Sequence, residues 1–276
     1  MEMTAAGLGT RREMSTAVGL RAVALPAEHG GWGLVAEPLL LGLCVAPSAA
    51  GALVATAVLA AFLWRHPARL AVADLRRGAR YPRTRAAVAA AGVYALLALV
   101  AGAGAVTLSK TSLFGLAAMI APFASVYLAY DARLQSRQLV AELAGAVALS
   151  VGAPAVALAA GWGQGAALGL WVLVAGRSVP AVLHVRGRLR RARGVPSPAW
   201  PAAVCGSAFT LGAMLAAWTG LVPVAAVLAS LVLLARIVRD GAAGGAAVRP
   251  RDVGWQEVRA GLAAVAAWTL VYWIAA

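Results

Sequence analysis

Long apolar runs separated by short polar stretches dominate the chain. A helix needs about 17–25 mostly apolar residues to cross a membrane, and runs of this kind recur along most of the sequence. We place nine of them, at residues 31–47, 48–64, 86–106, 112–130, 139–160, 163–184, 200–217, 219–236 and 259–275. The pattern predicts an all-α integral membrane protein with about nine transmembrane helices in one bundle. This single polytopic domain covers residues 28–276 and follows an N-terminal tail at residues 1–27.

The composition agrees with a membrane protein. Of the 276 residues, 62% are hydrophobic and only 12% are charged, whereas about a quarter of the residues in soluble domains are charged. Cys44 and Cys205 both fall within apolar runs and have no paired spacing, so neither a disulfide framework nor a zinc site is indicated. Arg21 interrupts the apolar stretch near the N-terminus, so we interpret the tail as a short cytosolic segment rather than a signal peptide.

Basic residues are distributed very unevenly between the gaps. Of the 24 Lys and Arg residues, all except Lys110 and Arg177 lie in the tail or in or beside the gaps that follow the second, fourth, sixth and eighth runs, and Arg177 lies inside the inner end of the sixth run. Cytoplasmic loops carry the excess of Arg and Lys, so the N-terminus is predicted inside and the C-terminus outside. The net charge of +14 belongs to these loops and not to a separate basic domain. Anionic membrane lipid is therefore the predicted partner, and nucleic acid is not.

Two charged residues are predicted to lie within the membrane. Glu37 lies seven residues beyond Gly30, and Arg177 lies seven residues before His184, so each is about 10 Å from the inward-facing end of its helix. A charge at that depth is costly unless it is paired. The matching depths predict an ion pair or a shared polar cavity that is open to the cytoplasm.

Polar and basic residues gather at the inner ends of the predicted helices. Arg177, His184 and Arg188 fall within about 60° of one another on a helix, and Arg65 and Arg69 form a similar stripe after the second run. An alternative interpretation is that such arginines only contact anionic lipid head groups. The predicted ligand-binding residues are Glu28, Arg65, His66, Arg69, Asp74, Tyr130, Glu142, Arg177, His184, Arg186 and Arg188.

The three histidines His29, His66 and His184 all lie at the predicted inner rim. A three-histidine metal site is geometrically conceivable, but no two of them share a tight ligand spacing, so no metal site is predicted. His29 and Glu37 are predicted either to orient the ligand-binding arginines or to serve as acid and base, since the pKa of an imidazole is easily tuned near neutral pH.

Several short motifs resemble the YwiC-like family of bacterial membrane proteins. They are Pro26-x-Glu28-His29-Gly30-x-Trp32, then Arg65-x-Pro67, and later Val179-Pro180-x-Val182-Leu183-His184-Val185-Arg186. The resemblance covers most of the chain. It implies a multi-pass protein of the bacterial cytoplasmic membrane, and it implies no particular reaction.

A more distant similarity links the chain to the UbiA-type intramembrane prenyltransferases. That resemblance implies nine helices around a cavity that opens inward, with metal–diphosphate motifs at the inner ends of the second and sixth helices. The UbiA family presents Asp-rich motifs there to hold Mg²⁺, but this chain has only Asp74 in the first region and no acid between Arg177 and Arg193. Mg²⁺ is therefore conceivable but not predicted, and no cofactor is assigned.

The leading hypothesis is an Arg/His/Glu-lined cavity that faces the cytoplasm and binds a phosphorylated or anionic amphiphile. A polyprenyl phosphate or diphosphate is the expected kind of ligand, because arginine binds phosphate directly through bidentate hydrogen bonds. Whether prenyl transfer follows without the usual metal motifs is left open. The alternatives are a small-anion transporter and a non-catalytic membrane scaffold.

Overall fold

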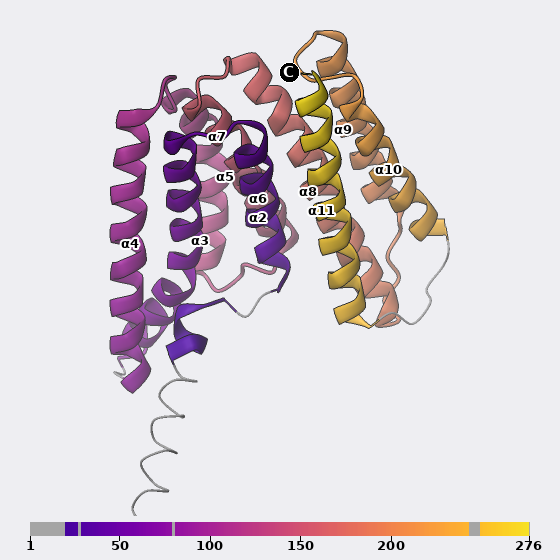
Figure 1. The fold of residues 1–276 in the computed structure, drawn as a ribbon. Helices are drawn as coiled ribbons and strands as arrows, with labels where there is room; N and C mark the ends of the chain where they lie inside the picture. The colour runs from indigo at the N-terminus through magenta and orange to yellow at the C-terminus, as the bar shows by residue number, and fades with distance from the viewer. Residues whose placement is uncertain (1–19, 27–28, 79–80, 243–248, 276) are drawn as a thin grey trace, which may run out of the picture. The chain divides into compact units, whose positions relative to one another are not determined.

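The described part of the computed structural model is helical. It covers residues 20–26, 29–78, 81–242 and 249–275, and no strand occurs within these ranges. The labelled helices (Figure 1) are α2 (His29–Val45), α3 (Ala49–Arg76), α4 (Pro82–Leu108), α5 (Phe114–Ala132), α6 (Leu139–Ser150), α7 (Gly152–Ala159), α8 (Gln164–Ala192), α9 (Trp200–Trp218), α10 (Ala226–Ala242) and α11 (Pro250–Ala275).

Seven helical stretches in the described residues are long and apolar enough to cross a membrane. They are α3, α4, α5, α6 together with α7, α8, α9 and α11, while α2 is a shorter apolar helix. The prediction of an all-α integral membrane protein is confirmed. The number of crossings and their orientation stay predictions, as does the boundary of the membrane domain, because residues 1–19 and 27–28 lie outside the described residues.

Each predicted apolar run corresponds to a helix, but the ends of several helices differ from the prediction. The eighth run was expected to begin at residue 219, and that start is wrong, because α9 ends at Trp218 and α10 begins only at Ala226. Gly220 takes a positive φ of 73°, which closes the end of α9 as a glycine cap does. Pro223 then follows in the connection. Proline often stands just past a helix end, because it cannot continue the helix.

The fifth run is divided into two helices at its middle. α6 ends at Ser150 and α7 begins at Gly152. Pro154 has no backbone N–H, so it cannot donate the helical hydrogen bond to Ser150, and its ring crowds the same carbonyl. A Cβ added at Gly152 would lie 2.9 Å from a methyl group of Leu39 and 3.3 Å from Pro38. The glycine therefore lets α2 approach the break closely.

The chain forms two compact units, each built from two separate segments. Unit 1 consists of Met1–His29 and Thr56–Gly102, and unit 2 consists of Gly30–Ala55 and Ala103–Ala276. Each unit is described by itself below.

In unit 1, the turn between α3 and α4 is held by one buried carboxylate. Asp74 is 1% exposed and accepts hydrogen bonds from Arg83, at 2.9 and 3.2 Å, and from the Thr84 hydroxyl, at 2.9 Å. The guanidinium of Arg83 also lies 5.1 Å from the centre of the Tyr81 ring. Asp74 thus joins the end of one helix to the start of the next.

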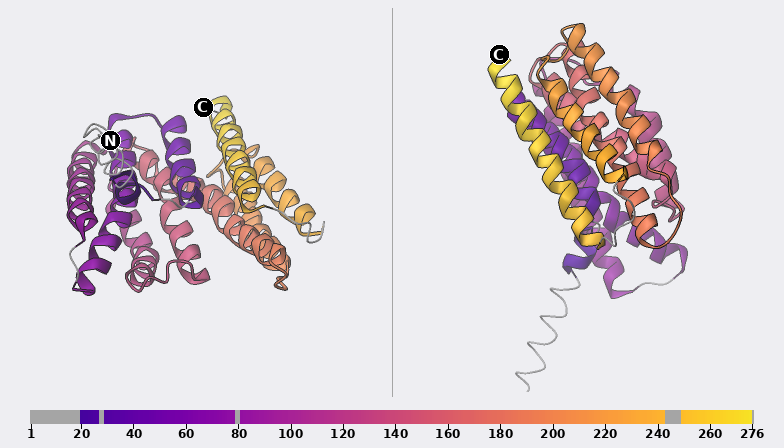
Figure 2. Two further views of the ribbon diagram at one scale, coloured as in Figure 1. Left: turned by 90° about the horizontal axis from the view of Figure 1, so that it is seen from below. Right: turned by 90° about the vertical axis from the view of Figure 1, so that its right-hand side faces the viewer.

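In unit 2, α8 lies at the centre of the apolar core. Leu170 and Leu173 of α8 are fully buried, and they belong to the same cluster as Leu41 of α2 and Trp268 of α11. The indole of Trp268 donates a hydrogen bond of 3.0 Å to the backbone oxygen of Ala226, at the start of α10. Figure 2 shows α8, α9 and α10 side by side, in agreement with the contacts between them. This packing brings the ends of α8, α10 and α11 together.

Candidate functional site

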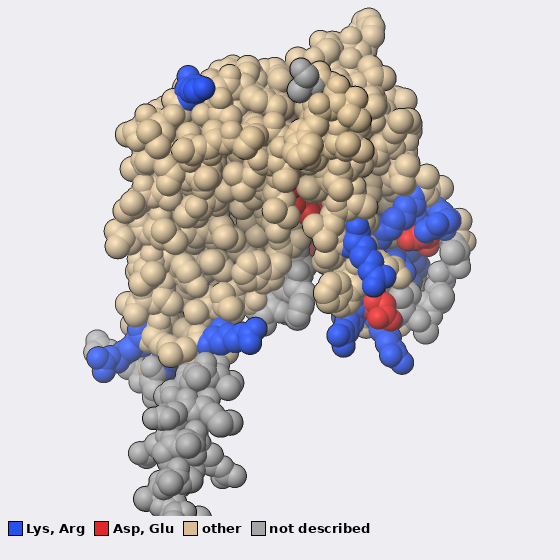
Figure 3. All heavy atoms as spheres, in the orientation of Figure 1, with Lys and Arg blue, Asp and Glu red and all other residues tan. Residues whose placement is uncertain are grey.

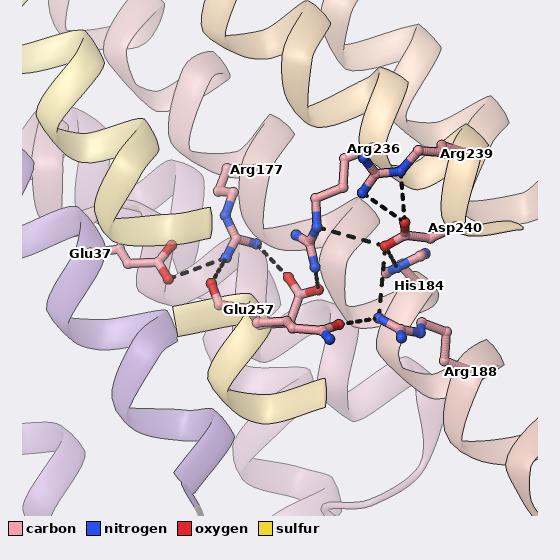
Figure 4. Close-up of polar contacts among 9 residues, drawn as sticks. Glu37, Arg177, His184, Arg188, Arg236, Arg239, Asp240 and Glu257 are labelled. Carbon is pink, nitrogen blue, oxygen red and sulfur yellow. Dashed lines mark hydrogen bonds and ion pairs between the residues drawn. The ribbon is translucent and has the colours of Figure 1, made fainter. Parts of the chain in front are cut away.

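Arg177 of α8 joins three helices through one buried guanidinium. Its side chain is 6% exposed, and its Nη2 atom lies 3.4 Å from Oε1 of Glu37 on α2 (Figure 4). The same Nη2 donates a 2.7 Å hydrogen bond to the backbone oxygen of Glu257 on α11, and Nη1 lies 3.4 Å from that residue's Oε2. The Glu37–Arg177 pair predicted from their matching depths is therefore confirmed.

Glu257 and Asp240 extend this contact into a larger cluster. Glu257 also accepts a hydrogen bond from Arg236 of α10. Asp240 of α10 lies 3.6 Å from His184, 3.7 Å from Arg188 and 3.8 Å from Arg236 (Figure 4). We call the set the ion-pair cluster, and its members are Glu37, Arg177, His184, Arg188, Arg236, Asp240 and Glu257.

The charges of the ion-pair cluster compensate one another. It contains three carboxylates and three guanidiniums, together with one imidazole. The exposed Arg239 adds a further contact to Asp240, at 3.1 Å. In Figure 3, blue and red surfaces intermingle over the ends of α8, α10 and α11, while tan surface covers most of the remaining length of these helices. An anion that entered the cluster would have to displace a carboxylate.

The space beside Arg177 is also small. It amounts to about 10 Å³, which is room for one water molecule. Its polar lining consists of Arg177, His184, Thr210, Ser230, Arg236 and Glu257. A phosphate group does not fit in a space of that size. The ligand-binding role of Arg177 and the acid–base role of Glu37 both stay predictions.

A larger pocket lies at the junction of α8 and α9. Its volume is about 240 Å³, and we call it the arginine-lined pocket. It is lined by Leu139, Leu183, His184, Arg186, Gly187, Arg190, Arg191, Pro196, Ser197, Pro198, Ala199, Pro201 and Ala202. Within the described part of the chain, this lining contains three arginines and no carboxylate. The lining of the pocket therefore combines basic and apolar side chains.

Two of the lining arginines are held in place by nearby oxygens. Arg186 donates hydrogen bonds to Glu142, at 2.8 Å, and to the backbone oxygen of Arg137, at 3.0 Å. Arg191 donates a 3.0 Å bond to the backbone oxygen of Ser197. Arg190 is exposed. Glu142 and Arg186, both predicted as site residues, thus contact each other at the edge of this pocket.

The remaining predicted residues are distributed as follows. In unit 1, the His66 ring lies 3.0 Å from the backbone oxygen of Ala22, and Arg65 and Arg69 belong to the same helix, α3. Tyr130 is half-buried near the end of α5. Whether Arg65 and Arg69 share a cavity with the residues of unit 2 stays a prediction.

Two predicted residues cannot be placed. Glu28 lies outside the described residues. His29 begins α2, but its side chain is also outside the described part. The acid–base role of His29 therefore stays a prediction.

Sequence reasoning missed Glu257, Asp240 and Arg236 as site residues. One signal was available, since Arg236 and Asp240 are four residues apart, the spacing at which opposite charges meet on a helix. For Glu257 the signal was weaker, because it precedes the last apolar run and appeared to lie in a loop.

The carboxylates of the described residues do not fit the Mg²⁺ site that the UbiA resemblance implies. Asp74 is bonded to Arg83, and Glu257 is bonded to Arg177 and Arg236. In the described ranges, no group of three or more His, Cys, Asp or Glu side chains could hold a metal ion. Guanidiniums occupy the positions around these oxygens that a cation would need.

The helices, their apolar surfaces and the buried charges define a polytopic, all-α membrane protein. The family model described as YwiC-like protein matches residues 25–157. The predicted resemblance to this family is thereby confirmed for the segment that runs from ahead of α2 into α7, while the Val179–Arg186 motif lies beyond it. No curated protein and no solved structure matches the chain.

Proposed function

We propose that this protein resides in the bacterial cytoplasmic membrane and binds a phosphorylated or otherwise anionic amphiphile in the arginine-lined pocket. The observation that carries the proposal is the composition of that pocket. Arg186, Arg190 and Arg191 face the same space as the apolar residues Leu139 and Leu183.

The two kinds of lining residue match the two parts of an amphiphile. Guanidiniums form bidentate, charge-assisted hydrogen bonds with phosphate oxygens, so the arginines suit a head group. The apolar lining residues, which include Leu139 and Pro201, suit the first part of a hydrocarbon chain. A prenyl phosphate or diphosphate meets both requirements.

The size and charge of the two spaces favour this pocket over the ion-pair cluster. Its volume is about 240 Å³, compared with about 10 Å³ beside Arg177. The pocket also presents arginines without an equal number of carboxylates, whereas the cluster is balanced. Arg190, which is exposed, is available to a ligand without breaking an internal ion pair.

The orientation of the pocket follows from the charge map. The arginines of α8 belong to the basic side of the chain, and that side is expected to face the cytoplasm. The amphiphile would therefore enter from the inner leaflet. Localisation in the cytoplasmic membrane is part of the same proposal.

Native mass spectrometry of the purified full-length protein tests the proposal. We expect wild-type protein to carry a co-purifying phosphorylated lipid, or to acquire added geranyl diphosphate. The Arg190→Ala variant should lose most of the bound species, whereas Arg193→Ala should keep it, because Arg193 is exposed and does not line the pocket. Wild-type protein that neither carries nor acquires such an amphiphile would overturn the proposal.

Prenyl transfer and small-anion transport stay predictions beyond this binding function. Release of diphosphate from labelled prenyl diphosphate in vesicles, without added Mg²⁺, tests the first. Anion flux into proteoliposomes tests the second.

A further inference from the structure

His184 lies between the arginine-lined pocket and the ion-pair cluster. It lines both the pocket and the small space beside Arg177. Its side chain is 3% exposed, and its Nε2 atom lies 3.6 Å from Oδ2 of Asp240. That nitrogen is buried and has no hydrogen-bond partner among the described residues. The ring is thus enclosed, has one carboxylate nearby, and adjoins the space that the proposed ligand would fill.

Charged groups face His184 from three helices. The surrounding cations are Arg177 and Arg188 of α8 and Arg236 of α10, and the surrounding anions are Asp240 of α10 and Glu257 of α11. On the pocket side, the charged neighbours are Arg186, Arg190 and Arg191. From α9, the lining residues of the two spaces include Ala202 and Thr210, which do not titrate.

We propose that His184 takes up a proton when an anionic head group binds in the arginine-lined pocket, so that binding of the amphiphile is coupled to protonation. This inference rests on the proposed function. In the free protein, burial of the ring opposes a positive charge on it, and the guanidiniums of Arg236 and Arg188 oppose it as well. A bound phosphate or diphosphate offsets that positive charge, and the imidazolium then has both Asp240 and the ligand as partners.

The coupling also defines the class of ligand. An anion with one or more full negative charges favours the charged imidazole, whereas a zwitterionic head group brings no net charge and has little effect. His184 is therefore a residue that determines specificity for phosphomonoester or diphosphate head groups. It acts by charge and needs no direct hydrogen bond to the ligand.

Titration calorimetry of the full-length protein in detergent tests the coupling, with geranyl diphosphate as the probe. Binding is measured in buffers of different ionisation enthalpy, which gives the number of protons exchanged. We expect wild-type protein to take up as much as one proton more than His184→Gln, whose side chain stays neutral. The ligand's own protonation change is common to both proteins and cancels in the difference.

The pH dependence of the affinity provides a second readout. Between about pH 6 and pH 8, wild-type binding should weaken by up to about tenfold per pH unit, because binding requires the neutral imidazole to take up a proton that becomes scarcer as the pH rises. Binding by His184→Gln should change much less. His184→Asn is a second neutral variant, and a thermal melt of each variant checks that it is folded.

The outcomes separate the two proposals. Equal proton uptake by wild-type protein and a folded His184 variant, both of which bind the probe, would overturn the coupling and leave the amphiphile pocket in place. Failure of the wild-type protein to bind the probe at any pH would overturn the pocket itself.

Discussion

The charges of the ion-pair cluster are arranged so that each has an oppositely charged neighbour. Arg177 is 6% exposed and Glu37 is 11% exposed, so both have lost most of their hydration. The cost of removing each such ion from water is several kcal/mol, and it is recovered only when the partner is well placed. The partners come from α2, α8, α10 and α11. The stability of the helix arrangement should therefore depend on the balance of charge more than on any one residue.

This balance gives a prediction about single and paired substitutions. Arg177→Met leaves Glu37 buried without the guanidinium, and it should lower the free energy of unfolding by about 3–5 kcal/mol. Adding Glu37→Leu removes the stranded charge, and the double variant should recover more than half of that loss. Glu257 keeps Arg236 as its partner in both variants. Unfolding in detergent, followed by circular dichroism, measures the effect.

An exposed arginine is the control for this comparison. The side chain of Arg239 is 77% exposed, and Arg239→Ala should leave the unfolding transition almost unchanged. A double variant no more stable than Arg177→Met alone would show that the pair is not the source of the loss.

At the residue scale, only part of the ion-pair cluster could be predicted from the sequence. The Glu37–Arg177 pair could be predicted because both residues lie inside apolar runs, where helical rise converts sequence position into depth. Glu257 and Asp240 lie in the polar segment between the last two runs. Hydropathy does not show there how far a residue lies from the membrane. Their partners became evident only once α10 and α11 were known to continue through that segment.

Between helices, close approach depends on glycine at particular positions. A Cβ added at Gly261 of α11 would overlap the carboxylate of Glu37 on α2. At Gly42 of α2, it would lie 2.8 Å from the Cβ of Val156 and 3.1 Å from the backbone of Ala153. Small residues of this kind let membrane helices pack at short distance, where dispersion contacts are most favourable. The absence of a side chain at Gly261 thus leaves room for the Glu37 carboxylate.

Two glycines of α11 provide a matched test of this packing. Gly261→Ala should lower the melting temperature, because the new methyl group must displace the Glu37 carboxylate or separate the two helices. Gly254→Ala should leave stability unchanged or raise it by up to about 1 kcal/mol, since alanine favours a helix and no atom lies within 4 Å of the added Cβ. Thermal melts of both variants in the same detergent measure the difference, and equal melting temperatures would contradict the close contact.

Helix positions were more predictable than helix ends. Each apolar run corresponds to a helix, apart from the fifth, which is divided into α6 and α7. Burial in lipid requires apolar side chains along the whole crossing, so hydropathy is informative there. It could not locate the ends, since a helix can continue into the aqueous layer after the apolar pattern stops. α3 therefore runs on to Arg76, and α8 to Ala192. The extension of α8 carries all three arginines that line the arginine-lined pocket.

At the scale of the whole molecule, charge asymmetry is the basis for the orientation. Apart from Lys110, the basic residues lie on one side of the predicted crossings. Cytoplasmic loops carry such an excess because positively charged segments are retained during insertion. The proposed pocket depends on this orientation, since its arginines belong to the basic side.

Cysteine accessibility in intact cells tests that orientation. In a variant without Cys44 and Cys205, single cysteines replace four exposed residues, which are Ser112, Gln135, Val195 and Thr219. An impermeant thiol reagent should label positions 112 and 219 in intact cells, and positions 135 and 195 only after the membrane is opened. Positions 112 and 135 flank α5, and positions 195 and 219 flank α9. Each of these two pairs therefore reports whether one helix crosses the membrane. Reversed labelling at all four positions would place the arginine-lined pocket outside, and two positions of one pair labelled from the same side would show that their helix does not cross.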